Sequence, residues 1–142
     1  MKLIAHRGNI QGKTHRENMP EYIEEALTAG YDVEIDVWNV LGVYYLGHDN
    51  PEYKISESFL EKEGLWCHAK NSQALSSMLK NPKIHCFWHD RDDYTLTSKG
   101  KIWIYPDKEP LEGGILVLRN DQEIPDDSDL EGVCSDFVGN LK

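Results

Sequence analysis

The chain has 142 residues, a size typical of one domain, and it carries a formal net charge of -10. This charge argues against a surface that binds DNA or RNA, because nucleic-acid phosphates are bound by clustered Lys and Arg. No run of residues approaches the roughly 18 apolar positions of a membrane span, so we expect one domain over 1–142 without such a span. The three cysteines lie in apolar runs without regular spacing, which favours reduced thiols in a cytoplasmic protein.

Strand-like and helix-like runs alternate along the first half of the chain. An apolar run at 2–5 predicts a strand, and Asn18 is a good N-cap for a helix that ends at Gly30. The other predicted helices are 56–63 and 72–80, and the other predicted strands are 31–38, 43–46, 65–69, 84–88, 101–105, 115–118 and 133–135.

This order of elements predicts an α/β fold with a mostly parallel sheet of about seven core strands. A complete (β/α)₈ barrel takes about 250 residues. We therefore expect a reduced or incomplete TIM-type (β/α) barrel with few outer helices in the C-terminal half. Because missing helices would leave apolar strand faces uncovered, we hypothesise a homodimer that covers them.

Charged side chains and imidazoles close three of the strand-like apolar runs, at 2–5, 31–33 and 43–46. The pairs are His6 with Arg7, Glu34 with Asp36, and His48 with Asp49. In α/β folds, ligands bind at the edge of the sheet where parallel strands end. Carboxylates, a fixed cation and groups that titrate near neutrality are what metal-assisted phosphoryl chemistry needs.

Glu34 and Asp36 face the same side of their strand, because side chains alternate along a strand. Two buried carboxylates on one face would repel each other unless a cation lay between them, and a divalent metal suits that place. A solvent-facing strand edge is the alternative for this pair. Arg7 offers a planar fork to a phosphate, and His89 ends the strand at 84–88, where it could line the same pocket and contact a substrate.

The order of these motifs resembles the glycerophosphodiester phosphodiesterase family, in the phospholipase-C-like phosphodiesterase superfamily. The residues that carry the resemblance are His6-Arg7-Gly8, Glu17-Asn18, Glu34-Ile35-Asp36 and His48-Asp49. The resemblance implies a TIM-type barrel, one divalent cation (Mg²⁺ or Ca²⁺), His6 and His48 as the general acid/base pair, and Glu34 and Asp36 as metal ligands. It also implies that Arg7 contacts the phosphate and that Asp49 supports the site from behind. Glu17 would either support the site in the same way or reach the metal itself.

The later part of the chain departs from the family pattern. The family's third strand usually carries Glu-x-Lys, whereas this chain has His68 and Lys70 at those positions. His68 is thus the expected third metal ligand, and an imidazole suits Zn²⁺ or Mn²⁺ better than Mg²⁺ or Ca²⁺. Lys70 still suits phosphate binding, and Asp136 resembles the family's closing acidic residue near the site.

The sequence therefore predicts a phosphoric diester hydrolase that is metal-dependent and cleaves a small glycerophosphodiester-like substrate. Two histidines would act as general acid and base, with a cyclic phosphate as a candidate intermediate. The alternative is a catalytically inactive barrel that binds a phosphorylated ligand or a partner protein. The short chain and His68 favour that alternative, and the presence of both His6 and His48 favours the enzyme.

Overall fold

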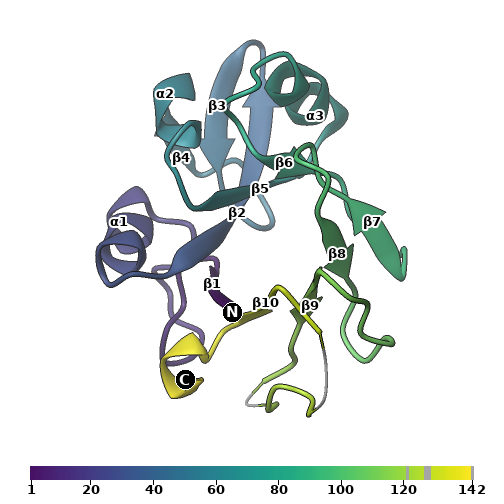
Figure 1. Ribbon diagram of the computed structural model, residues 1–142. Coiled ribbons are helices and arrows are strands. Elements are labelled where there is room, and N and C mark those ends of the chain that lie inside the picture. Colours follow the sequence, from purple (N-terminus) through teal and green to yellow (C-terminus); the bar gives the residue numbers. More distant parts are fainter. Residues whose placement is uncertain (121, 127–128, 142) are drawn as a thin grey trace.

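The computed structural model describes residues 1–120, 122–126 and 129–141 (Figure 1). Within these residues, ten strands form one sheet. The strands are β1 (Lys2–His6), β2 (Asp32–Val40), β3 (Val43–Leu46), β4 (Tyr53–Ile55), β5 (Leu65–Ala69), β6 (Cys86–Phe87), β7 (Tyr94–Leu96), β8 (Ile102–Ile104), β9 (Gly114–Val117) and β10 (Gly132–Ser135). The helices are α1 (Pro20–Thr28), α2 (Glu57–Leu60), α3 (Ser72–Leu79) and a 3₁₀ turn, η1 (Val138–Asn140).

The sheet is mixed and curled. Parallel pairing gives the spatial order β6-β5-β2-β1-β10-β9-β8. The far end of β2 continues into an antiparallel β2-β3-β4 meander, and β7 is antiparallel to β8. No described ladder joins β6 to β8, but the backbone N–H of Ser98 donates to the carbonyl of Cys86 at 2.8 Å. Figure 1 shows the strands bending around a common centre.

The expected reduced TIM-type (β/α) barrel is wrong. The molecule consists mostly of strands in a curled, mixed half-barrel sheet, and its helices are few and short. Between β6 and β10, the described connections contain a hairpin strand and loops but no helix. The repeating strand-helix unit that defines a TIM-type barrel is therefore missing from half of the chain.

Helices cover the outer face of the sheet only in its first half. Outward-facing side chains of β2 and β5, among them Val33, Ile35 and Cys67, are fully buried. They belong to one apolar cluster with Ile23 of α1 and Met78 of α3. This cluster gives the first half of the sheet an ordinary two-layer core.

Loop side chains replace helices over the second half of the sheet. Leu116 of β9 and Val133 of β10 are buried in a cluster that includes Leu130 and, packed against it, Ile124 and Leu141. Loops of the same chain thus cover the apolar face for which the sequence predicts no helix.

The inner face of the curled sheet has an apolar centre and two polar ends. Inward-facing residues from six parallel strands form the central cluster: Ile4, Trp66, Phe87, Trp103, Ile115 and Cys134. Side chains two positions before or after these residues face the same way along their strands. His6 and Lys2, for example, flank Ile4 on β1, so they lie toward opposite ends of the interior.

The first helix begins later than the sequence predicts, and Asn18 does not cap it. The N-cap is Met19, without a side-chain hydrogen bond, and Pro20 opens the helix. Asn18 adopts a left-handed backbone conformation (φ 65°) and turns its side chain toward β2. None of the described helices has the length and apolar character needed to cross a membrane.

Candidate functional site

A cavity of about 370 Å³ lies at the carboxyl ends of the parallel strands. It collects most of the residues that the sequence singled out. The lining residues are His6, Arg7, Glu34, Asp36, His48, His68, Lys70, His89, Asp90, Trp103, Tyr105, Pro106 and Val117. Glu17 and Asp49 are the two expected site residues that do not line this cavity.

Glu34, Asp36 and His68 form a compact group of potential metal ligands. One donor atom from each of the three lies within 4.8 Å of the others. Strand pairing explains this arrangement, because Asp36 on β2 is the direct partner of His68 on β5. Both carboxylates are almost completely buried, at 3% and 1% exposure for Glu34 and Asp36. Buried carboxylates so close together require a cation.

The hydrogen bonds of His68 show where that cation belongs. Nε2 lies 2.9 Å from the carbonyl oxygen of His89, which can only accept, so Nε2 carries a proton. Nδ1 then faces Glu34 Oε2 at 3.5 Å and Asp36 Oδ1 at 3.4 Å. A neutral ring would present a lone pair to two carboxylates. Either a proton on Nδ1 or a metal ion among the three groups resolves the conflict.

The local charges affect the pKa of His68 and Asp36 in opposite directions. Burial alone would lower the pKa of His68, but hydrogen bonds to Asp36 and Glu34 outweigh it and raise the pKa to about 9. Burial would raise the pKa of Asp36, but His48, His68 and Arg7 hold it well below its usual range. Oε1 of Glu34 is buried without a hydrogen-bond partner among the described residues. That oxygen is available to a further cation.

Arg7 and Asn18 hold Asp36 from the other side. Nε of Arg7 lies 3.3 Å from Asp36 Oδ2, and the Asn18 amide donates to the same oxygen at 2.9 Å. The backbone N–H of Asp36 in turn donates to Asn18 Oδ1 at 3.0 Å. Glu17 accepts from Arg7 at 3.1 Å, so it acts on the cavity through that guanidinium. Asn18 was predicted to be a helix N-cap, but its side chain instead holds Asp36 in the site.

His6 is held by Asp136, which ends β10 next to β1. Nδ1 of His6 lies 2.8 Å from Asp136 Oδ1, and the Asn9 amide donates to the same oxygen at 2.9 Å. Burial would lower the pKa of His6, but the Asp136 hydrogen bond and the charge of Glu34 raise it overall. A proton on Nδ1 leaves Nε2 directed at the cavity, 3.8 Å from Glu34 Oε1. Asp136 was noted in the sequence only through the family resemblance.

His48 comes from the turn after β3. Nδ1 lies 3.5 Å from Asp36 Oδ2, and Nε2 lies 3.3 Å from an Arg7 nitrogen, which can only donate. Like His6, this ring has one nitrogen beside a carboxylate, while its Nε2 faces the Arg7 guanidinium at the edge of the cavity. Asp49 is 84% exposed and lies 3.7 Å from His48 Nε2, so it touches the site only at its rim.

Lys70 and His89 border the cavity beside the carboxylate cluster. His89 presents its backbone carbonyl to His68, and its ring Nε2 lies 2.7 Å from the carbonyl of Asp92. Tyr105 also lines the cavity and contacts the His89 ring edge-on at 5.6 Å between centroids, where an aromatic can serve the core or stack on a ligand. An aromatic at the end of a strand gives no sequence signal that separates these roles.

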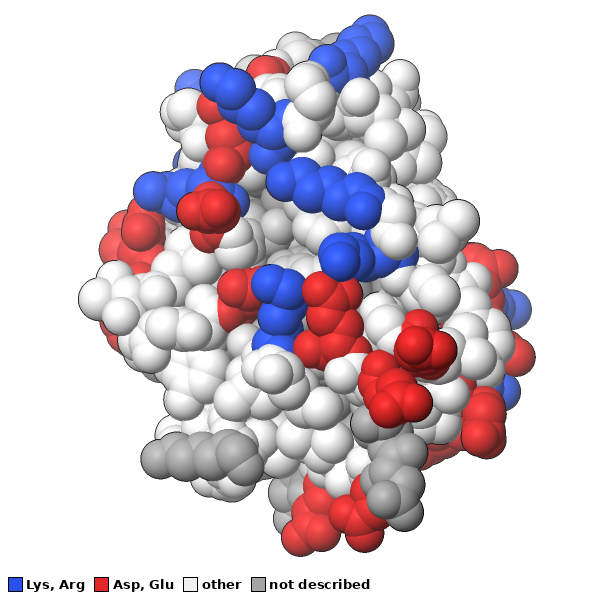
Figure 2. All heavy atoms as spheres, in the orientation of Figure 1, with Lys and Arg blue, Asp and Glu red and all other residues white. Residues whose placement is uncertain are grey.

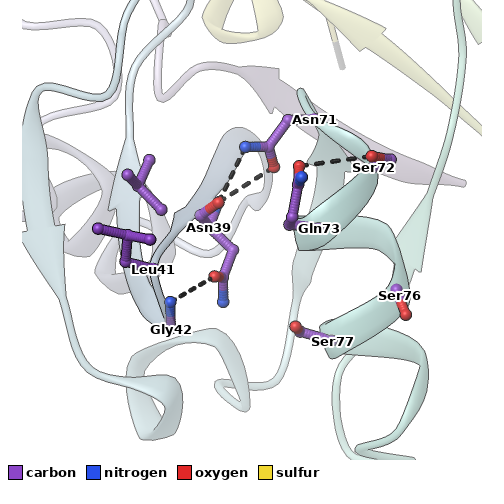
Figure 3. A pocket seen from close by; sticks show the side chains of 9 residues that line it. Asn39, Leu41, Gly42, Asn71, Ser72, Gln73, Ser76 and Ser77 are labelled. Atoms are coloured by element: carbon purple, nitrogen blue, oxygen red, sulfur yellow. Dashed lines mark hydrogen bonds between the residues drawn. The ribbon is translucent and has the colours of Figure 1, made fainter.

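A larger groove of about 720 Å³ lies between the β2-β3 turn and α3 (Figure 3). Its polar groups bond to one another: the Asn71 amide donates to the Asn39 carbonyl at 2.9 Å, and Gly42 N–H donates to Asn39 Oδ1 at 3.1 Å. No ionisable side chain lines it. The groove therefore lacks the groups that acid/base or metal chemistry requires.

Comparison with known proteins gives no functional assignment, so a proposal for the function depends on the geometry of the site. No family model, curated protein or solved structure matches this chain.

Proposed function

We propose that this chain is a metal-dependent phosphodiesterase that cleaves a small glycerophosphodiester-like substrate. One observation carries the proposal: two histidines, His6 and His48, line the same cavity as a three-residue cation site, and each has a ring nitrogen within 4 Å of one of its carboxylates. The two histidines come from β1 and from the turn after β3, so the fold brings them together from distant parts of the sequence. Such a pair is suited to general acid and base catalysis.

The residues present fit a divalent ion. Glu34, Asp36 and His68 would hold it, and the unpartnered Oε1 of Glu34 supplies a further oxygen. Two carboxylates and one imidazole suit Mn²⁺ or Zn²⁺ as well as Mg²⁺ or Ca²⁺. A bound ion of this kind polarises a phosphoryl oxygen and lowers the pKa of a hydroxyl beside it.

The chain's own side chains would do the rest of the work. Arg7 and Lys70 both line the cavity and would hold the phosphodiester anion. One of His6 and His48 would remove the proton of the attacking hydroxyl, and the other would protonate the leaving oxygen. Each such proton transfer is typically worth about 10² to 10⁴ in rate. Asp136 and Asp36 would keep the two rings oriented.

The test is turnover of bis(p-nitrophenyl) phosphate in Mg²⁺, Ca²⁺, Mn²⁺ or Zn²⁺. His6→Ala and His48→Ala should each abolish the metal-dependent activity and leave the circular-dichroism spectrum unchanged. His15→Ala is the matched control, because His15 is an exposed histidine outside the cavity. Full activity in either cavity variant, or activity that survives exhaustive chelation, would refute the assignment.

A catalytically inactive protein that binds a phosphorylated ligand or partner is the second candidate. The observation in its favour is that a protonated His68 already provides a cation between Glu34 and Asp36. Calorimetric titration with Mn²⁺ separates the two candidates. If the chain is the enzyme, Mn²⁺ should bind, and His68→Ala should weaken that binding. If the chain is the inactive protein, with a protonated His68 as the cation, no Mn²⁺ binding should be detected.

The cellular setting of this activity is also a proposal. All three cysteines are free and buried, and burial raises the pKa of the Cys67 and Cys134 thiols well above the usual value. Such thiols are suited to a reducing compartment. We therefore place the enzyme and its small phosphodiester substrate in the cytoplasm.

A further inference from the structure

A second cavity, of about 230 Å³, opens at the amino ends of the parallel strands. It lies at the opposite end of the sheet interior from the candidate metal site. Its walls come from the start of β1, the segment before β5, the segment before β6 and the turn before β8. Lysines dominate this lining: Lys2, Lys62, Lys83, Lys99 and Lys101.

Strand alternation explains why several of these groups converge. Lys2, His85 and Lys101 each precede an inward-facing core residue (Ile4, Phe87 and Trp103) by two positions. Side chains two apart on a strand share a face, which places Lys2 of β1 at the amino end of the interior. His85 and Lys101 directly precede β6 and β8, and both line the same cavity, with the His85 ring 4.2 Å from that of Trp66 between centroids. The N-terminus lies near the centre of the view in Figure 1, and Figure 2 shows Lys and Arg side chains, with Asp and Glu side chains among them, around a hollow in that same view.

The lining of this cavity carries more positive than negative charge, with five lysines against three acids. Within the described residues, Lys2, Lys83 and Lys99 form no ion pair, whereas Lys101 pairs with Glu131 at 3.0 Å and Lys62 with Glu24 at 3.0 Å. Three acids also line the cavity: Asp32, Glu61 and Glu63. Asp32 accepts from the Trp66 indole at 3.0 Å, and Glu61 accepts from the Asn81 amide at 2.7 Å.

The apolar centre of the sheet separates this cavity from the candidate active site. Trp66 and Trp103, with ring centroids 5.7 Å apart, belong to the cluster between the two ends. Lys70 lines only the carboxyl-end cavity, and Lys99 lines only the amino-end cavity. The two cavities share no lining residue.

We propose that the amino-end cavity is a binding site for a small phosphorylated anion. Ammonium groups act as point charges for phosphate oxygens. Five lysines against three carboxylates line one hollow on a chain whose net charge is -10, and three of these lysines form no ion pair with any described residue. The hollow has room for a phosphate group with a small substituent, and its volume excludes a larger ligand from complete burial. This inference is independent of the phosphodiesterase proposal, because it uses none of that site's residues.

His85 supplies a local reporter for this site. Its Nε2 lies 2.6 Å from Thr97 Oγ1, and no described residue hydrogen-bonds to its Nδ1. Burial lowers the pKa of His85 to about 4, with the charges of Lys99, Lys101 and Lys2 acting in the same direction and Glu131 opposing them. An anion bound among the lysines would cancel part of that positive potential. The imidazole resonances and the pKa of His85 should therefore both respond to it.

The experiment is an NMR titration of the histidine side chains of the full chain with inorganic phosphate. Sodium chloride at the same ionic strength is the reference, and pH is held at 7.5. We expect a saturable shift of the His85 resonances with phosphate, and a His85 pKa that is higher in phosphate than in chloride. Lys2→Gln and Lys99→Gln should each weaken phosphate affinity about threefold to fivefold, as expected for the loss of one charge partner at a partly exposed site.

Two matched variants make the result specific. Lys54→Gln removes an exposed lysine of β4 outside both cavities, and Lys70→Gln removes a lysine of the carboxyl-end cavity. Neither should change the response of His85. An equal response to chloride, an equal loss in Lys54→Gln, or a response that depends on Lys70 would each overturn the proposal. A non-saturable shift would likewise mean screening rather than binding.

Discussion

At the scale of single residues, Asp136 is the clearest positioning group in the candidate site. Its carboxylate accepts from His6 Nδ1 at 2.8 Å and thereby fixes which ring nitrogen faces the cavity. Asp136→Asn keeps the shape but offers an amide that can impose the other tautomer. We expect kcat to fall about 10-fold to 100-fold, as for other groups that orient a functional histidine.

A second measurement distinguishes positioning by Asp136 from a general structural role. The ¹⁵N shifts of the His6 ring report the tautomer directly. They should change in Asp136→Asn, while the melting temperature stays close to that of the parent chain. An unchanged tautomer with reduced activity would contradict this role for Asp136.

At the same scale, His68 should set the metal preference of the proposed cation site. Its Nδ1 completes a group with Glu34 and Asp36, where a carboxylate would be a harder ligand. His68→Glu should therefore shift relative affinity from Mn²⁺ toward Mg²⁺ and Ca²⁺, by about tenfold or more. Competitive calorimetry measures that ratio, and His68→Gln, which adds no charge, is the control. If the relative affinity for these metals changes equally in both variants, the charge of the new side chain is not the cause of the altered metal preference.

At the scale of elements, the turn after β3 is what carries His48 to the cavity. Gly47 N–H donates to the Asp36 carbonyl at 3.1 Å, and the Trp38 indole donates to the Gly47 carbonyl at 2.7 Å. A Cβ at position 47 would lie 1.9 Å from the backbone oxygen of Asn50. Gly47→Ala should therefore destabilise the fold by about 1–3 kcal/mol through overpacking.

Urea unfolding measures this cost, and Gly100→Ala provides the comparison. Gly100 also has a positive φ, but a Cβ there would meet nothing within 4 Å. The difference between the two variants isolates the collision from the backbone preference of glycine. Equal destabilisation would show that the turn can relax around Asn50.

Elements with strong local signals were predictable, and those defined by distant contacts were not. The strands at 43–46 and 65–69 have the predicted bounds, because their apolar runs are closed by glycine or polar residues. β4 and β7 were missed, since each has only three residues and depends on its pairing with a neighbouring strand. For the site, the position of charged residues and histidines at the ends of predicted strands identified most of the cavity residues. The bonds of Asn18 to Asp36 depend on a tertiary contact that no local pattern encodes.

At the scale of the whole molecule, the described connections between β6 and β10 contain no outer helix, and this explains both why the barrel prediction is wrong and why a dimer was expected. Loop residues Ile124, Leu130 and Leu141 pack over β8 to β10, so that face has its own cover. A homodimer stays a prediction, and the exposed apolar side chains of β7 are one surface for it, with Leu96 at 69% exposure.

Sedimentation velocity at micromolar concentration tests the homodimer. A dimer that uses β7 should dissociate in Leu96→Lys, because the variant places a charge in the contact. Leu41→Lys is the control, since Leu41 is 98% exposed on the β2-β3 turn, away from β7. A parent chain that sediments as a monomer would contradict the prediction outright.

Acid stability of the whole fold should depend on His85. Its pKa is about 4 in the folded chain against 6.5 for an ordinary histidine, because burial and then the nearby lysines disfavour the charged ring. Between these two values the unfolded chain binds more protons than the folded one, so this histidine makes stability fall as pH drops from 6.5 to 4. Above 6.5 both states are neutral at this position, and the contribution is constant.

His85→Gln should remove that part of the pH dependence, because glutamine is uncharged throughout and can still bond to Thr97. Urea unfolding at several pH values gives the difference in unfolding free energy between parent and variant. That difference should be flat above pH 6.5 and move in favour of the variant as pH falls toward 4. The exposed His15→Gln should track the parent chain across the same range. A His85→Gln curve parallel to the parent would mean that the folded chain accepts a proton at His85 as readily as the unfolded one, and the lysines around it would then not create the positive potential inferred here.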